Sequence, residues 1–381
     1  MARAQALTEY LEAHRPQMIA ELEELVRLET PSGDEAALSR AAEVVARRWE
    51  GLGAHVRRHR VPGVGVHLEV TLGQGPSDDG AALVLGHLDT VYPIGTLQAW
   101  PFRIDGSRAY GPGAYDMKAG LVMMAWAVQA LDAVGARPRR SVRLLVTADE
   151  EVGSGSSRPL IEQAARGAAL ALVLEPAAPG GAVKTARKGV ARYRLEVTGK
   201  SAHAGNDVER GVSAVVALAE LVLAAHALSR PSDGTTVNVG VVGGGTRPNV
   251  VPERAWADVD VRFVTRAEAE RVDRDLRALA ASNGARVEVS GGVDRWPLER
   301  TQAVAELYRQ AREAAAELGI ELGEAAVGGA SDGNLTAALG LPTLDGLGPV
   351  GDGAHSAASE YVDTSELPRR TALLACLLER L

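Results

Sequence analysis

The chain has 381 residues, of which 46% are hydrophobic and 24% are charged, so it can bury a large core, and its length favours two domains over one. A formal net charge of -8, with no run of Lys and Arg, excludes the basic surface that nucleic-acid-binding proteins use. A single cysteine, Cys376, excludes both a disulfide framework and a zinc site built from thiolates.

The N-terminal part of the chain predicts two helices followed by two strands. Apolar residues keep helical spacing over 7–28, where Pro16 marks a second start, and again over 35–52. Alternating apolar and polar residues then predict strands over 54–61 and 64–72. We assign no chemistry to these elements.

Three histidines, His55, His59 and His67, lie in the two predicted strands among arginines. No carboxylate accompanies them in the pattern, so we expect surface or edge positions for all three rather than metal ligation. A polar turn over 75–80 follows the second strand.

The segment between residues 83 and 175 contains four short apolar stretches that each end in an acid or a histidine. Helices predicted over 117–131 and 157–165 lie between these stretches, so the strands should be parallel. Parallel strands present ligands at their carboxyl ends, where these side chains would converge in one crevice. The residues at these ends are His87 with Asp89, Asp116, Glu150 with Glu151, and Glu175.

This convergence predicts a metal site. Glu150 and Glu151 are adjacent carboxylates at a buried strand terminus, and they repel each other unless a cation divides their roles. One of them would bind metal while the other handles protons. On its own, Asp116 is equally well explained as the N-cap of the following helix. His355, in a glycine-rich loop, is the obvious supplier of a nitrogen ligand that the carboxylates lack.

The hydrophobic pattern changes after Glu175, and the next hundred residues predict a small α/β unit. Its elements are a strand over 193–198, a helix over 212–228, strands over 236–242 and 255–264, a helix over 267–281 and a strand over 286–290. We predict a domain inserted at 188–296 between the two parts of a catalytic domain, 1–187 and 297–381. The second part begins with a helix over 301–318. The fold class is α/β, a mostly parallel sheet flanked by helices with a smaller α/β lid domain.

A second enzyme class is conceivable from one local motif. Residues 329–333 fit the G-x-S-x-G elbow of serine hydrolases, with Ser331 as nucleophile and His355 following an acid, Asp345 or Asp352. Against this hypothesis, the triad would be crowded into some two dozen residues, whereas that fold needs further strands between nucleophile and histidine. It would also leave the upstream acids unexplained.

Six motifs together resemble the M20 metallopeptidase family, in the order and spacing of that family. The closest likeness is to its glutamate carboxypeptidase (carboxypeptidase G) branch. The motifs lie at 86–91, 113–120, 149–153, 174–176, 201–205 and 353–356. The resemblance implies a catalytic domain that holds two zinc ions and a smaller lid domain that forms a homodimer.

The resemblance also implies a role for each matching residue. Asp116 would bridge the two metals, His87 and Glu175 would complete one site, and Glu151 and His355 would complete the other. Glu150 matches the general base, Asp89 the acid that orients His87, and His203, from the lid of a neighbouring subunit, the donor to the negative oxygen formed during cleavage. A cis peptide bond is expected after Asp116. Arg262, with its neighbour Asn249, matches the arginine that receives a substrate carboxylate.

The implied activity is zinc-dependent cleavage of an amide bond adjacent to a free α-carboxylate, in a small peptide or an N-acyl amino acid. The alternatives are a deacylase, desuccinylase or dipeptidase on the same scaffold. A protein that only binds metal or peptide would have lost its base, and Glu150 is present. Arg262 has a structural alternative, a surface salt bridge with Asp260 or Glu253. Because no segment approaches the roughly 18 apolar residues of a membrane span, we expect a cytoplasmic protein without a membrane partner.

Overall fold

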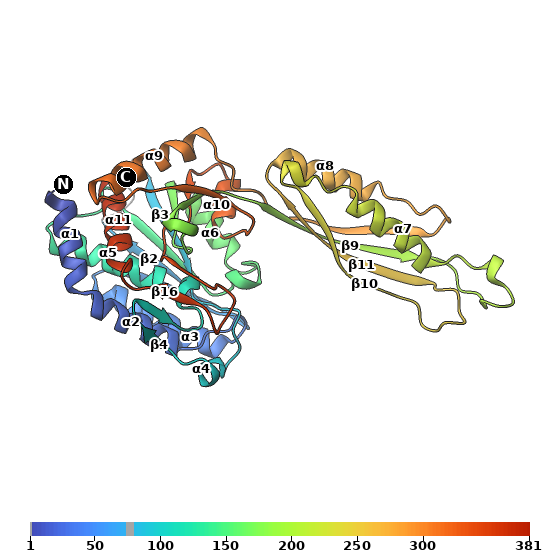
Figure 1. Cartoon of the computed structure of the whole chain (residues 1–381), viewed down its shortest axis with the longest axis horizontal. Coiled ribbons are helices and arrows are strands. Elements are labelled where there is room, and N and C mark those ends of the chain that lie inside the picture. Colours follow the sequence, from blue (N-terminus) through green and yellow to red (C-terminus); the bar gives the residue numbers. More distant parts are fainter. Residues whose placement is uncertain (1, 74–79) are drawn as a thin grey trace. The chain divides into compact units, whose positions relative to one another are not determined.

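A computed structural model describes residues 2–73 and 80–381, and the chain divides into two compact units (Figure 1). Unit 1 contains the chain up to Ala186 together with Arg300–Val327 and Ser331–Leu381. Unit 2 contains Arg187–Glu299 and Gly328–Ala330, which includes the segment predicted as an insertion. The turn predicted over 75–80 falls almost entirely outside the described residues.

A six-stranded sheet forms the centre of unit 1, in the order β1-β2-β6-β3-β7-β14. Strand β3 is parallel to β6 and β7, and β14 is parallel to β7, whereas β2 is antiparallel to both β6 and β1. The sheet is therefore mostly parallel, as predicted. The strands are β1 (His55–Val61), β2 (Gly65–Leu72), β3 (Ala81–His87), β6 (Val142–Thr147), β7 (Ala168–Val173) and β14 (Thr343–Leu344).

Helices cover both faces of this sheet. Side chains alternate along β3, so Val84 enters one apolar core while Leu83 and Leu85 enter another on the opposite face. The larger core is shared with α1 (Ala2–Ala13), α2 (Arg15–Arg27), α3 (Glu35–Gly51), α5 (Ala119–Ala133), α9 (Gln302–Glu317) and α11 (Leu367–Arg380). The smaller core is shared with α6 (Arg158–Ala165) and α10 (Gly333–Ala338).

Two smaller sheets and several short turns complete unit 1. One sheet has the order β15-β16-β5-β4, and β8 pairs with β13 in the other. The bounds are α4 (Thr96–Ala99), β4 (Arg103–Asp105), β5 (Arg108–Tyr110), β8 (Val183–Arg187), β13 (Glu324–Val327), β15 (Gly351–Asp352) and β16 (Tyr361–Asp363), with helical turns η1 (Ala114–Lys118), η2 (Glu150–Val152) and η3 (Pro179–Gly181).

Unit 2 is a four-stranded antiparallel sheet in the order β10-β11-β9-β12, with α7 and α8 packed on one face. Its strands alternate buried and exposed residues, as expected for a sheet with one covered face. The elements are β9 (Gly189–Thr198), α7 (Ala214–His226), β10 (Thr236–Gly244), β11 (Arg254–Phe263), α8 (Arg266–Arg277) and β12 (Arg286–Arg295), with turns η4 (Val208–Arg210) and η5 (Pro231–Asp233).

Two predictions made from the sequence pattern are wrong. Asp116 does not end a strand, because it lies in the irregular turn η1 between β5 and α5. His67 is not at the surface or an edge: it is 1% exposed on β2, an interior strand, where its ring nitrogens contact Ser156 Oγ at 2.9 Å and the amide of Ala148 at 3.1 Å. His59 does lie on the edge strand, but the carboxylate of Glu69 is only 3.1 Å from its Nε2.

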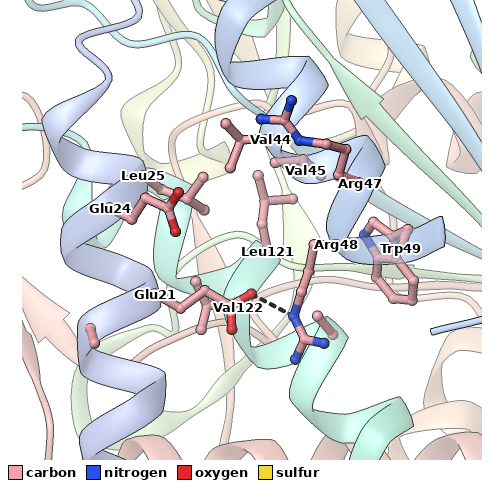
Figure 2. Close-up of a pocket in the computed structure, with 12 residues that line it drawn as sticks. Glu21, Glu24, Leu25, Val44, Val45, Arg47, Arg48, Trp49, Leu121 and Val122 are labelled. Atoms are coloured by element: carbon pink, nitrogen blue, oxygen red, sulfur yellow. Dashed lines mark hydrogen bonds and ion pairs between the residues drawn. The ribbon is translucent and has the colours of Figure 1, made fainter. Parts of the chain in front are cut away.

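A groove of about 420 Å³ lies between α2, α3 and α5 (Figure 2). An ion pair of 2.9 Å between Arg48 and Glu21 crosses it, above a floor formed by Leu121 and Val122. None of the predicted site residues lines this groove. Within the described residues, no helix is both long and apolar enough to cross a membrane.

Candidate metal centre

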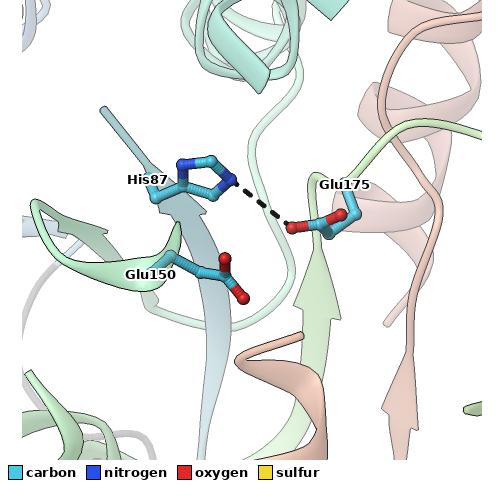
Figure 3. A group of neighbouring side chains, drawn as sticks. All are labelled: His87, Glu150 and Glu175. Carbon is cyan, nitrogen blue, oxygen red and sulfur yellow. Dashed lines mark ion pairs between the residues drawn. The ribbon is translucent and has the colours of Figure 1, made fainter. Parts of the chain in front are cut away.

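The carboxyl ends of the central parallel strands bring together two predicted ligands, His87 and Glu175, and the predicted general base, Glu150 (Figure 3). His87 is the last residue of β3, Glu150 begins the turn after β6, and Glu175 follows β7. One ligand atom from each of these three side chains lies within 4.8 Å of the others. His87 Nε2 is 3.5 Å from Glu175 Oε1.

A second group forms around Asp116, Glu151 and His355. His355 Nε2 lies 3.4 Å from Asp116 Oδ2 and 3.1 Å from Glu151 Oε2. The other oxygen of Asp116, Oδ1, lies 3.2 Å from His87 Nε2. Asp116 therefore directs one oxygen toward each group, which is the arrangement that a bridging ligand needs. The Asp116–Met117 peptide bond is cis, as the resemblance implied.

The turn that holds Asp116 is placed by close packing at the start of α5. A side chain at Gly120 would put its Cβ 2.4 Å from the carbonyl oxygen of Leu174, so only glycine lets α5 approach the chain this closely. Since Glu175 is the next residue, this contact brings the start of α5, which follows the Asp116 turn, beside the segment that carries Glu175.

The donor set fits a divalent cation such as zinc. Nitrogen and carboxylate oxygen are the ligands that zinc accepts when no thiolate is present. Within the part of the chain that the structure describes, His87 Nε2 and Asp116 Oδ1 are both buried and lie 3.2 Å apart, yet neither makes a well-formed hydrogen bond. Buried polar atoms are rarely left in this state, and a shared cation would satisfy both.

Burial and the neighbouring charges shift the pKa values of the side chains in this centre. The hydrogen bonds that the protonated ring of His355 donates to the carboxylates of Asp116 and Glu151 raise the pKa of His355 to about 10. Burial alone would lower the pKa of His87, but Asp116, Asp89 and Glu175 outweigh it and raise that pKa. Burial alone would raise the pKa of Asp116, but His355 and His87 outweigh it and lower that pKa. Metal binding must therefore release protons.

Asp89 orients this centre through the main chain as well as through His87. Its fully buried carboxylate accepts hydrogen bonds from the amides of Glu150 and Glu151, each at 3.1 Å, and from the Ser32 hydroxyl at 2.7 Å. His87 Nδ1 bonds to the carbonyl oxygen of Asp89 at 3.0 Å, while the carboxylate is 3.5 Å away. When the ring is neutral, its proton therefore sits on Nδ1, and Nε2 faces the position of a metal.

The predicted residues of unit 2 lie at two different ends of its sheet. His203 and Asn249 belong to neighbouring loops, because the Ala204 amide donates to the Asn249 carbonyl at 3.1 Å. Arg262 pairs in register with Val190, near the opposite end of β11. Its guanidinium makes two hydrogen bonds to Asp260, at 2.7 and 3.0 Å, which is the salt bridge considered as the structural alternative.

His203 has a defined tautomer. Its Nδ1 accepts hydrogen bonds from the amides of Gly205 and Asn206, both at 3.1 Å. The neutral ring must then carry its proton on Nε2, and the side chain is exposed. The exposed edge of His203 is therefore a hydrogen-bond donor.

Several buried polar residues that lie around the centre were not predicted from the sequence. Glu360 is fully buried beside the turn of Asp116, and Asp332 accepts hydrogen bonds from Ser154 and Thr147 next to the glutamate pair. Lys118 is buried too, and burial lowers its pKa to about 8. Glu360 follows His355 closely in the sequence, and that proximity to a ligand was the available signal.

Ser331 does not have the geometry of a nucleophile elbow. Its side chain is fully buried and its hydroxyl donates to Asp345 Oδ2 at 2.6 Å, while Asn334 Oδ1 accepts the Ser331 amide at 3.0 Å. The Nε2 atom of His355 faces Asp116 and Glu151 instead.

Known proteins resemble the chain over most of its length. The family model described as Peptidase family M20/M25/M40 matches residues 83–380. Carboxypeptidase G2 from Pseudomonas sp. (strain RS-16) is 32% identical over 373 residues, covering 96% of this chain and 89% of the relative. Succinyl-diaminopimelate desuccinylase from Acidovorax ebreus (strain TPSY) is 31% identical over 308 residues, covering 74% and 76%.

The fold agrees with these sequence matches. The crystal structure of aminopeptidase PepT from Bacillus cereus has a TM-score of 0.81 to this chain at 25% identity, covering 96% of this chain and 98% of that one. The names of these three proteins refer to the cleavage of different bonds. The matches therefore support a shared family and do not identify a substrate. The chain belongs to peptidase family M20/M25/M40, whose members are metal-dependent peptidases and amidohydrolases.

Proposed function

We propose that this protein is a hydrolase with two zinc ions per chain that cleaves an amide bond next to a free α-carboxylate. The observation that carries the proposal is the position of Asp116, which directs one oxygen toward His87 and the other toward His355. Glu150 lies in the same group as His87 and Glu175, and the proposed hydrolysis requires a general base beside these residues. Elemental analysis of protein purified without added metal should find about two zinc ions per chain, and a content near zero would contradict the proposal.

Zinc held by these side chains would lower the pKa of a water molecule and polarise the carbonyl group of the scissile amide. Glu150 accepts the proton of the attacking water and returns it to the leaving nitrogen. Asp89 keeps Glu150 and Glu151 in distinct positions, because it binds the main-chain amide of each. His203 donates from Nε2 to the oxygen that becomes negative during the attack.

The length of the unit 2 sheet supports a site shared between two subunits. Along β11, the step of eight residues from Arg262 to Arg254 spans about 26 Å at roughly 3.3 Å per residue. His203 lies beyond the Arg254 end, since Gly199 bonds to Glu253 and the chain continues away from the sheet. Because a small substrate is shorter than this separation, we propose that His203 and Arg262 of one chain serve different centres. In a homodimer, one chain would supply His203 and Asn249 and the other would supply Arg262.

The surface of unit 2 supports the homodimer. β10 is an edge strand, and its residues Val241 and Val242 are 52% and 58% exposed. The neighbouring helix α7 exposes Val215, Val216 and Leu223. An edge strand with exposed apolar residues is a template for pairing with another chain, and a second copy is the simplest partner. Sedimentation equilibrium should give a dimer; a monomer at assay concentration would contradict the shared site.

Arg262 is the candidate for the α-carboxylate of the substrate, because a guanidinium fits a carboxylate through two parallel donors. In this structure Asp260 occupies that fork, so a substrate carboxylate would have to displace or share it. Arg262→Lys should lower kcat/KM strongly, and amidation of the substrate carboxylate should cost the wild type a comparable factor. If the wild-type protein cleaves the amidated substrate equally well, the carboxylate requirement is wrong, while the metal centre stands.

A second candidate is removal of an acyl group from an N-acyl amino acid, which the relative named succinyl-diaminopimelate desuccinylase favours. The carboxypeptidase hypothesis draws on the longer match to carboxypeptidase G2. Both substrate classes carry a carboxylate next to the cleaved amide, so the metal centre does not separate them. A panel of folyl-glutamate, N-acetyl and N-succinyl amino acids and dipeptides, tested on the zinc-loaded protein, would do so.

A further inference from the structure

Glu360 joins the two segments that carry Asp116 and His355. Its main-chain amide donates to the carbonyl of Ser356 at 2.8 Å, and its own carbonyl accepts from Gly111 at 3.3 Å. One contact ties it to the loop of His355 and the other to the segment that leads into η1. Glu360 itself immediately precedes β16, which pairs with β5.

The side chain of Glu360 makes a second set of contacts within the turn of Asp116. Its Oε1 accepts hydrogen bonds from the amides of Tyr115 at 2.9 Å and of Asp116 at 3.1 Å. Its Oε2 accepts a hydrogen bond from the hydroxyl of Tyr92, which lies shortly after Asp89 in the chain. The carboxylate is fully buried, so these donors are what compensates the loss of its hydration.

The irregular backbone of η1 explains why such a group is needed. Asp116 and Met117 have non-helical angles, with φ and ψ of -113° and 95°, and of -135° and 33°. The first amides of a helix lack partners within the helix, and a short side chain just before it usually accepts from them. Here the N-cap Gly113 has no side chain, and the carboxylate of Glu360 accepts from these amides instead.

We propose that Glu360 is a positioning residue of the metal centre, which fixes the Asp116 turn against the His355 loop so that Asp116, Glu151 and His355 meet at one cation. The inference rests on the metal centre proposed above. Glu360 would support the main chain of the Asp116 turn in the way that Asp89 supports the main chain of Glu150 and Glu151. The side chain of Glu360 binds the main-chain amide of Asp116, so it would act through the main chain of a proposed ligand.

The test compares Glu360→Ala and Glu360→Gln with a control, Asp345→Ala. Asp345 is also a fully buried acid of unit 1 that binds a loop, through the Ser331 hydroxyl and the amide of Gly346, and neither of these partners belongs to the proposed ligand set. Zinc affinity is measured by competition with a chromophoric chelator, zinc content by elemental analysis, and Tm on the metal-free proteins.

We expect Glu360→Ala to weaken the binding of at least one zinc ion by about 10- to 100-fold, the usual effect of removing a group that supports a ligand. Glu360→Gln keeps an acceptor oxygen for the two amides and should recover part of that loss. Asp345→Ala should lower Tm with zinc affinity unchanged. If Glu360→Ala folds poorly, the Gln variant and Tyr92→Phe, which removes one donor, should still show smaller losses of zinc affinity.

Wild-type zinc affinity at both sites in the Glu360 variants, with only Tm lowered as in the control, would overturn the inference. Absence of zinc from the wild-type protein would overturn the metal centre itself and the inference with it. The two failures are therefore distinguishable in one series of measurements.

Discussion

Replacing Asp89 by asparagine would test whether the glutamate pair depends on a support outside it. The carboxylate of Asp89 accepts from the amides of Glu150 and Glu151 at 3.1 Å each and from the Ser32 hydroxyl at 2.7 Å. An asparagine amide keeps one acceptor oxygen and presents an NH₂ group on the other side. At least one of the two main-chain N–H groups therefore loses its acceptor in a fully buried place.

The size of the effect follows from that loss. A hydrogen bond to a charged group contributes roughly 1.5–3 kcal/mol, and a buried donor without a partner costs roughly 1–3 kcal/mol. A difference of about 1.4 kcal/mol is tenfold, so kcat/KM and zinc affinity should each fall by about 10- to 100-fold in Asp89→Asn. The tautomer of His87 should survive, because the main-chain carbonyl of Asp89 accepts from Nδ1.

Steady-state kinetics and chelator competition on Asp89→Asn and Ser32→Ala are the assay. Ser32→Ala removes one hydroxyl donor and leaves both main-chain hydrogen bonds in place, so its effect should stay near 1 kcal/mol, less than about tenfold. If Asp89→Asn keeps wild-type kcat/KM and zinc affinity, or if both variants lose equally, the glutamate pair is not positioned by Asp89.

Three further outcomes are expected. Glu150→Gln should retain both metals and lose about 10²- to 10⁴-fold in rate, because it keeps the size of the side chain and removes the base, and near wild-type turnover of this variant would show that Glu150 is not the base. Glu151→Gln should instead lower the metal content. The pKa of His355 is raised from 6.5 to about 10, so the pairing of its protonated ring stabilises the metal-free protein fully below pH 6.5, and this stabilisation is lost as the pH rises toward 10. The Tm should therefore fall over that pH range more steeply without zinc than with it. Equal slopes would contradict this assignment. Mixing inactive His203→Ala with inactive Glu150→Gln subunits should restore some activity in confirmed hybrids, and none if the site lies within one chain.

The convergence of two of the proposed ligands could be predicted because it follows from the direction of the strands. A buried parallel strand shows in the sequence as a short apolar run, and its carboxyl end faces the common crevice. His87 and Glu175 sit at or directly after such ends. Asp116 does not, and its place depends on the glycine contact between α5 and the end of β7, which no periodicity reveals.

The error at His67 has a similar origin. Alternation along β2 predicts a half-exposed strand. In the structure Val66, Leu68 and Val70 face the core that contains α3, and His67 points to the opposite face, which the segment around Ser156 covers. His67 is then buried, with Ser156 Oγ and the amide of Ala148 as its partners, both far away in the sequence. A local pattern shows which face of an element is apolar and leaves open how many neighbours the element has.

The residues that support the ligands come from the most distant parts of the chain. Asp89 binds Ser32 near one end, and Glu360 binds Tyr92 and the amide of Asp116 from near the other. These contacts join segments through buried carboxylates, and their only trace in the sequence is an acid beside a motif. A relative with the same ligands but without one of these two acids would keep the donor atoms and lose the support that holds them in place. Retention of the ligand set is therefore weaker support for an active centre than retention of the ligands together with Asp89 and Glu360.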